Sequence, residues 1–131
     1  MDKKMKEILD HAIYGTPEIK PEERALFLTT FRERIHVALT KSQVIKAGTY
    51  DEVINVMKTK RNLKLFLNGN LSYSIYSNYI QQANANGVPF TIVTPTTNTP
   101  FGLVLADGTD AVSRQSFVIE DDWYIQDTEE N

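Results

Sequence analysis

Two short apolar runs, each followed at once by uncharged polar residues, constrain the fold of this chain most strongly. The first run, residues 63 to 67, leads into Asn68-Gly69-Asn70, and the second, residues 89 to 93, leads into a Thr- and Pro-rich segment. Between them, residues 72 to 86 have the apolar spacing of a helix. The order strand, helix, strand predicts two parallel strands in an α/β sheet. Ligands of such sheets bind outside the carboxyl ends of the strands, so the sequence also predicts where a site lies.

Other segments extend this unit to a whole domain. The expected fold is a single α/β domain over residues 1 to 119, with a mixed sheet of four to five strands flanked by helices, followed by an acidic tail over residues 120 to 131. Two helices are predicted at the N-terminus, the first over residues 1 to 14 and the second from Pro21, with Leu28, Phe31 and Ile35 on its apolar stripe. The other strands are expected at residues 35 to 40 and 102 to 106, with a short fifth at 117 to 119.

The periodicities also predict which side chains form the core. Residues whose spacing places them on a face that meets the sheet are expected to be buried together. They are Leu65, Leu67, Phe90, Ile92, Val104, Ile54, Met57, Tyr76 and Ile80.

Length and composition limit the class of protein. A chain of 131 residues suits one domain with a real core, and the absence of cysteine excludes disulfides, thiolate catalysis and cysteine-bound zinc. The charged N-terminus is not followed by an apolar stretch of signal length, and no run approaches the ~20 apolar residues of a membrane span. We therefore expect a cytoplasmic protein with no membrane association.

Charge is divided unevenly along the chain. All but one of the 14 Lys and Arg residues lie at or before Lys64, whereas six of the 17 acidic residues lie in the last twelve positions. Without that tail, 14 basic residues face 11 acidic ones, so the body carries a charge of about +3. The second half relies on Asn, Ser, Thr and Tyr for its polar surface. A site built there would recognise its ligand by hydrogen bonds and stacking more than by charge.

Several blocks of residues, found in order along the chain, resemble a known family. They are residues 14 to 23, 30 to 34, 38 to 41, 67 to 70, 87 to 93 and 100 to 105. Together they are similar to the YueI family of small bacterial proteins, which has no established biochemical function. The resemblance implies a mixed α/β sheet like that of the chorismate-mutase-like and kink-turn ribosomal-protein group. It implies no catalytic residue.

Polar residues that follow the predicted strands form the candidate site. If the first three strands are parallel, their following segments emerge on the same edge of the sheet, and Lys41 is the only cation among them. Such a rim could hold an anionic or hydrogen-bonding ligand. Alternatively, Asn68-Gly69-Asn70 only turns the chain and caps the next helix. The candidate ligand-binding residues are Lys41, Ser42, Asn68, Gly69, Asn70, Ser72, Thr94, Thr96 and Asn98.

No pattern of catalytic or metal-binding residues is present in the sequence. His11 lies in the first predicted helix, where a surface role is expected, and no acid or nucleophile is placed beside His36 by sequence, which favours a structural role. Asp107-Gly108-Thr109-Asp110 lacks the later acidic ligands of a calcium loop and is better explained as a turn after a strand. We expect no catalytic residue, no metal and no cofactor.

Three functions are compatible with these features. The first is a non-enzymatic ligand-binding or regulatory protein whose partner is a small molecule or another protein. The first alternative is a small enzyme acting on a polar metabolite, but the sequence shows no paired acid and base for catalysis. The second is a weak RNA-binding module, but the sequence shows no concentrated basic patch. The acidic tail contains Trp123, Tyr124 and Ile125, which either pack on the body or dock a basic partner. Sequence does not decide the oligomeric state, although exposed sheet edges often pair.

Overall fold

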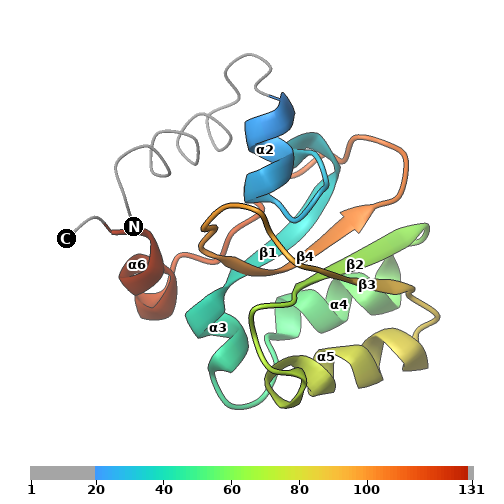
Figure 1. Cartoon of the computed structure of the whole chain (residues 1–131). Coiled ribbons are helices and arrows are strands. Elements are labelled where there is room, and N and C mark those ends of the chain that lie inside the picture. The colour runs from blue at the N-terminus through green and yellow to red at the C-terminus, as the bar shows by residue number, and fades with distance from the viewer. Residues whose placement is uncertain (1–19, 130–131) are drawn as a thin grey trace.

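The strand, helix, strand unit lies at one side of a four-stranded sheet in the computed structural model, which describes residues 20 to 129 (Figure 1). Strand β2 (Leu63–Asn68) leads into helix α5 (Tyr73–Ala85), which returns the chain to strand β3 (Phe90–Val93). The two strands are parallel, with Leu65 paired to Phe90. The predicted crossover unit is confirmed.

The strand order of the sheet is β1-β4-β2-β3. Strand β1 (Ile35–Thr40) lies at one edge, and β4 (Phe101–Asp107) lies between β1 and β2, antiparallel to both. Strands β1, β2 and β3 therefore run in the same direction. The fold is the expected single α/β domain with a mixed sheet, and four strands are formed in the described part of the chain.

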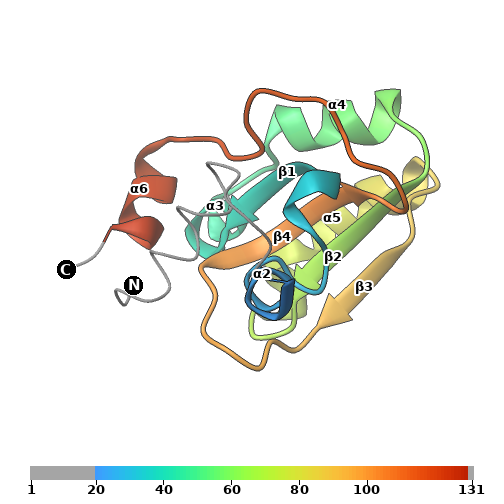
Figure 2. The same ribbon diagram turned by 90° about the horizontal axis from the view of Figure 1, so that it is seen from above.

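Helices cover the two faces of the sheet and form two hydrophobic clusters. On one face lie α4 (Asp51–Thr59) and α5, whose apolar sides meet alternate residues of the central strands; on the other lie α2 (Lys20–Leu26) and the segment that follows it (Figure 2). The remaining helical segments are the 3₁₀ helix η1 (Arg32–Arg34), α3 (Lys41–Ile45) and α6 (Asp122–Thr128).

The second predicted helix is shorter than its apolar stripe indicates. Helix α2 ends at Leu26, and the next residues turn sharply, with positive φ angles of 54° at Leu28 and 78° at Thr29. The Thr29 N–H donates to the Arg24 carbonyl at 2.7 Å, which closes the helix end. Glycine usually occupies such left-handed positions, so a chain without glycine here lacks the usual sequence signal for the end of a helix. The first predicted helix, residues 1 to 14, lies outside the described residues.

The core prediction is right for the central strands and wrong for the edge. Leu65 and Leu67 are fully buried in the cluster beneath α4 and α5, but Phe90 and Ile92 are 38% and 44% exposed. The reason is that, in the part of the chain that the structure describes, β3 has a neighbouring strand on one side only, which sequence periodicity cannot show. Val104 is also buried, but in the cluster on the opposite face of the sheet.

The short fifth strand is reduced to a single bridge between Ala38 and Val118. The Ala38 N–H donates to the Phe117 carbonyl at 2.7 Å, and Arg114 Nε donates to the Ile35 carbonyl at 2.6 Å. These contacts lay the segment before α6 along the outer edge of β1. One edge of the sheet is therefore covered by the chain itself.

Candidate functional site

The three segments of the predicted rim meet at one end of the sheet, because β1, β2 and β3 run in the same direction and their carboxyl ends lie there. The Lys41 N–H donates to the Pro100 carbonyl at 2.8 Å, and the Gly69 N–H donates to the Val93 carbonyl at 2.7 Å. The structure thus brings the ends of the strands together as expected. It divides the candidate residues, however, into three groups with different surroundings.

The first group contains the only cation of the predicted rim. Lys41 Nζ lies 3.5 Å from Asn98 Oδ1, beside a small pocket of about 150 Å³ that Asp127 also lines. The Asp127 carboxylate accepts hydrogen bonds of 2.7 Å from both the backbone N–H and the hydroxyl of Ser42. A carboxylate of the chain itself therefore occupies the donors of Ser42.

The second group serves the turn between β2 and α5. The Asn68 side chain is fully buried; its Nδ2 donates to the Phe101 carbonyl at 3.0 Å, and its Oδ1 accepts from the Asn70 N–H at 2.8 Å. A β-carbon on Gly69 would lie 3.2 Å from Thr94 Oγ1, so this position leaves little room for a side chain. Ser72, not Asn70, is the N-cap residue of α5, and its hydroxyl lies 3.2 Å from that of Ser74.

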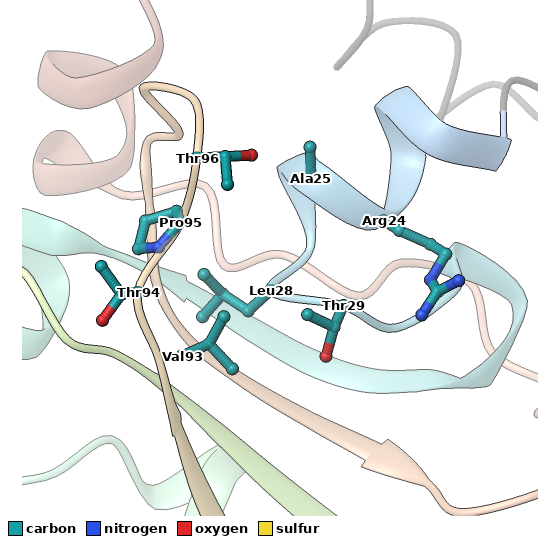
Figure 3. A pocket seen from close by; sticks show the side chains of 8 residues that line it. All are labelled: Arg24, Ala25, Leu28, Thr29, Val93, Thr94, Pro95 and Thr96. Carbon is teal, nitrogen blue, oxygen red and sulfur yellow. The ribbon is translucent and has the colours of Figure 1, made fainter.

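The third group lines the larger pocket of the rim, with a volume of about 290 Å³ (Figure 3). One wall is the continuation of β3, which contributes Val93, Thr94, Pro95 and Thr96, and the other is the end of α2 with its turn. In Figure 3, Leu28 lies between the two walls, and Arg24 lies on the far side from Thr96. The remaining lining residues are Ala25 and Thr29.

The backbone of one wall is strained. Thr29 is β-branched and has a φ angle of 78°, a left-handed conformation that such residues rarely adopt, and Leu28 beside it has a φ angle of 54°. Strained residues of this kind cluster at functional sites, where the surrounding structure holds them in place. Here the Thr29 N–H is held by the end of α2, and Leu28 is anchored in the core.

Sequence reasoning missed the α2 wall of this pocket. Arg24, Ala25, Leu28 and Thr29 all fall within the one continuous helix that the sequence predicts, so the turn at Leu28 and Thr29 that shapes this wall was not expected. The only signal against that helix is the pair Thr29-Thr30, because β-branched residues are weak helix formers.

The histidine of β1 lies away from the rim. His36 Nε2 is buried without a hydrogen-bond partner among the described residues, and burial lowers the pKa of this imidazole. A neutral ring without a partner fits the structural role expected for it. Within residues 20 to 129, no group of three or more acidic or histidine side chains could hold a metal ion, and no helix has the length and apolarity to cross a membrane.

The turn after β4 is an Asp-centred turn. Asp107 Oδ1 accepts hydrogen bonds from the N–H groups of Thr109 and Asp110, at 2.9 and 2.8 Å. These two bonds, with smaller contributions from His36 and Asn62, lower the pKa of the Asp107 carboxyl. The carboxylate therefore serves its own turn, in agreement with the reading of this segment as a turn.

The acidic tail folds back onto the body through a polar cluster around Asp121. This carboxylate caps α6 by accepting from the Tyr124 N–H at 3.0 Å, and it also accepts from Gln43 Nε2 at 3.0 Å and from the Tyr50 hydroxyl at 2.5 Å. Gln43 is fully buried and reaches the Ile119 carbonyl as well, at 2.7 Å. Helix α6 accordingly lies beside α3 (Figures 1 and 2).

The three apolar residues of the tail behave differently. Tyr124 is buried, whereas Trp123 and Ile125 are both 42% exposed. Packing on the body, one of the two alternatives read from the sequence, therefore holds for Tyr124, whereas Trp123 and Ile125 remain partly exposed.

Acid is expected to release α6 from the body. Burial opposes ionisation of Asp121, but the hydrogen bonds from Tyr50, Tyr124 and Gln43 outweigh it and lower the pKa of this carboxyl from the ordinary 3.8. Because the pKa of Asp121 is lower in the folded protein than in the unfolded chain, the ionised carboxylate stabilises docking at a pH above the unfolded-state pKa. This contribution is lost as the pH falls through the lower folded-state pKa. Fluorescence of Trp123, the only tryptophan, should shift to the red below pH 3.8. In Asp121→Asn this acid transition should be absent; an identical transition would contradict the assignment to Asp121.

Comparison with known proteins places the chain among relatives of unknown role. The model of a family described as "Protein of unknown function (DUF1694)" matches residues 2–117. The uncharacterized protein YueI of Bacillus subtilis (strain 168) is 45% identical over 122 residues, which are 92% of each chain. The crystal structure of the Bacillus subtilis YueI protein superimposes with a TM-score of 0.87 at 43% identity, over 98% of this chain and 100% of that one. The resemblance read from the sequence blocks is confirmed.

Proposed function

The chain belongs to the DUF1694 family of proteins of unknown function, and from its rim we propose that it is a non-enzymatic ligand-binding or regulatory protein. Its site is the rim at the carboxyl ends of β1, β2 and β3, and the pocket between β3 and α2 is the part that receives the ligand. Thr94 and Thr96 belong to this pocket directly. Ser42, Asn68, Gly69 and Ser72 support the shape of the rim, while Lys41, Asn70 and Asn98 present polar groups beside it.

The observation that carries this proposal is the composition of the pocket wall. Apolar atoms of Leu28, Val93 and Pro95 stand beside three threonine side chains, and Arg24 is the single charged residue in the lining. Ligand sites of proteins combine a mainly apolar surface with a few placed polar groups in this way. The volume of about 290 Å³ suits a molecule of metabolite size. The strained backbone of Thr29 supports the same location.

The lining favours binding over catalysis. None of the eight residues that form the pocket is a carboxylate, an imidazole or a lysine, so the pocket wall offers no general base. Arg24 could orient an anionic group, and its guanidinium is held 5.6 Å above the Phe31 ring. The preferred ligand is therefore a small polar molecule that carries at most one anionic group. The rival enzyme function would need an acid and a base supplied from elsewhere.

A role in RNA binding has less support. Only Arg24 and Lys41 line the two pockets of the rim as cations, and Asp127 lies beside Lys41. Nucleic-acid binders display concentrated basic surfaces, because contacts with phosphates provide most of their affinity.

The cysteine-free composition is consistent with a reducing compartment, so we propose that the protein is cytoplasmic.

Filling the pocket should abolish binding without affecting the fold. Thr96→Phe places a phenyl ring in the pocket, whereas Thr97→Phe places the same ring on the next exposed residue, which does not line it. Two-dimensional NMR spectra of the unaltered protein, titrated with a library of small polar metabolites and with inorganic phosphate, should show shifts in the amides of Val93, Thr94 and Thr29. These shifts should persist in Thr97→Phe and disappear in Thr96→Phe.

The outcome that contradicts the proposal is equally specific. If a metabolite binds with equal affinity to both variants, the ligand site lies elsewhere. If neither metabolites nor phosphate perturb the pocket amides at millimolar concentration, the pocket is not a ligand site. Unchanged melting temperatures of the two variants would show that the comparison concerns the pocket and not the fold.

A further inference from the structure

Among residues 20 to 129, strand β3 is the outermost strand at one side of the sheet and has an open edge, as Figure 2 shows. The carbonyls of Pro89 and Val93 accept hydrogen bonds from the N–H groups of Leu65 and Gly69, so these two carbonyls point toward β2. Backbone groups of alternate residues in a strand point the same way, which turns Thr91 toward β2 as well. The N–H and C=O groups of Phe90 and Ile92 therefore point away from the sheet.

The other edge of the sheet is treated differently. There, the chain lays residues 114 to 118 along β1, and the outward groups of Ala38 and Ile35 have partners in Phe117 and Arg114. In the described part of the chain β3 pairs with β2 alone. Residues 114 to 118 thus cover one edge, and no segment within residues 20 to 129 covers the opposite edge.

Three of the devices that commonly prevent edge pairing, namely charged side chains, proline within the strand and a bulge, are missing from β3. Edge strands of soluble proteins are commonly protected by charged side chains, by proline or by a bulge. Phe90-Thr91-Ile92-Val93 has no charge and no proline, and its pairing with β2 is regular. Phe90 and Ile92 are large apolar side chains with 38% and 44% of their surface exposed. The edge therefore presents both unpaired backbone groups and apolar surface.

The charge distribution indicates which partner this edge accepts. No charged residue lies between Lys64 and Asp107, a stretch that includes β3, its flanking loops and all of α5. Strand β3 and its flanking loops carry no charge of their own, and Arg24 is the one charged residue that lines the pocket beside them. Such a surface has little electrostatic attraction for nucleic acid or an acidic membrane, and it can face its own copy with little like-charge repulsion. We propose that β3 pairs antiparallel with β3 of a second copy of this chain, which joins two sheets into one.

The directions of the backbone groups fix the register. In an antiparallel pair, opposite residues that exchange two hydrogen bonds must both point outward. Phe90 therefore lies opposite Ile92 of the second copy, and the two-fold axis passes beside Thr91, which lies opposite itself. Every outward N–H and C=O of the strand then has a partner. Phe90 also meets Ile92 of the second copy on one face of the joined sheet, because directly opposite residues share a face.

A charge swap at Thr91 tests this register. Thr91 is exposed, and its self-paired position brings two identical side chains within contact distance across the axis. Sedimentation equilibrium should show a concentration-dependent dimer for the unaltered protein. Thr91→Lys and Thr91→Glu should each raise the dimer dissociation constant at least about tenfold, because like charges oppose each other. An equimolar mixture of the two variants should recover the dimer as a heterodimer.

A second pair of variants tests the backbone contacts. Ile92→Pro removes an N–H that points away from β2, so the sheet within one copy is retained while one hydrogen-bond donor to the second copy is lost, and dimerisation should weaken. Ile92→Val keeps that donor and a β-branched side chain, and it should dimerise as the unaltered protein does. Circular dichroism and melting temperature verify that all variants are folded.

Three outcomes would overturn the proposal. The unaltered protein could stay monomeric up to millimolar concentration, which would mean that nothing pairs with this edge or that another segment of the same chain covers it. The Lys and Glu variants could dimerise separately as well as the unaltered protein does, which would place the interface elsewhere. A mixture that fails to form the heterodimer would exclude the two-fold axis at Thr91.

Discussion

Leu67→Ala is expected to lower the free energy of unfolding by about 2–5 kcal/mol. Leu67 is fully buried in the cluster between the sheet and helices α4 and α5, and it pairs with Leu103 of β4 on one side and with Ile92 of β3 on the other. Removing its side chain loses the transfer free energy and leaves a cavity in a close-packed interior. Urea unfolding followed by circular dichroism measures the loss, which is a large part of the ~5–15 kcal/mol stability of a domain.

Asn70→Ala provides the comparison for this variant. Asn70 is exposed and is not the N-cap of α5, since that position belongs to Ser72. Its replacement should therefore change stability by no more than about 0.5 kcal/mol. Losses of similar size in the two variants would contradict the structure, because they would mean either that Leu67 is not in a packed core or that Asn70 holds the turn.

Asp121→Ala is expected to loosen α6 by about 2–3 kcal/mol, the combined effect of losing a helix cap and hydrogen bonds to a charged group. The alanine leaves the Tyr50 hydroxyl and one donor of Gln43 without their acceptor. Burial alone still raises the pKa of Tyr50 in this variant, so the hydroxyl stays protonated and remains a buried donor without its acceptor. Local opening of α6 should increase about 30- to 150-fold.

Hydrogen exchange measures that opening directly. The amides of Ile125 and Glu129 donate within or at the end of α6, and they should lose protection in Asp121→Ala while amides of β4 keep it. Asp122→Ala is the matched control, because Asp122 is the next acidic residue and is exposed. Equal exchange in the two variants would show that the Asp121 cluster does not hold the tail.

The elements with strong local signals could be predicted from the sequence. The parallel unit of β2, α5 and β3 was predictable because two apolar runs end at polar turns and the helix between them has a clear stripe. The meeting of Lys41, Asn68 and Thr94 at one edge followed from the strand directions alone. The strands, the helix and the turns that carry these features are each determined by residues close together in the chain.

Features without a clear local signal in the sequence could not be predicted. Helix α2 ends because residues 28 and 29 adopt the left-handed backbone conformation, and neither is a glycine, the residue that usually indicates this conformation in a sequence. The carboxylate of Asp127 reaches Ser42 across 85 positions of sequence, a pairing that no local pattern encodes. The exposure of Phe90 and Ile92 depends on β3 being an outer strand, and the apolar pattern of an outer strand resembles that of a central one.

The placement of β4 has a consequence for how the polypeptide reaches its native state. This strand lies between β1 and β2, although it follows both in the chain, and Leu103 joins Leu39 on one side to Leu67 on the other. Until residues 101 to 107 arrive, neither earlier strand can form its main pairing. The entropy lost in closing such long loops must be overcome before the contacts that offset it can form, which slows folding. On the ribosome, β1 and β2 are therefore synthesised before the strand that joins them, and the sheet is completed only after β4 has emerged.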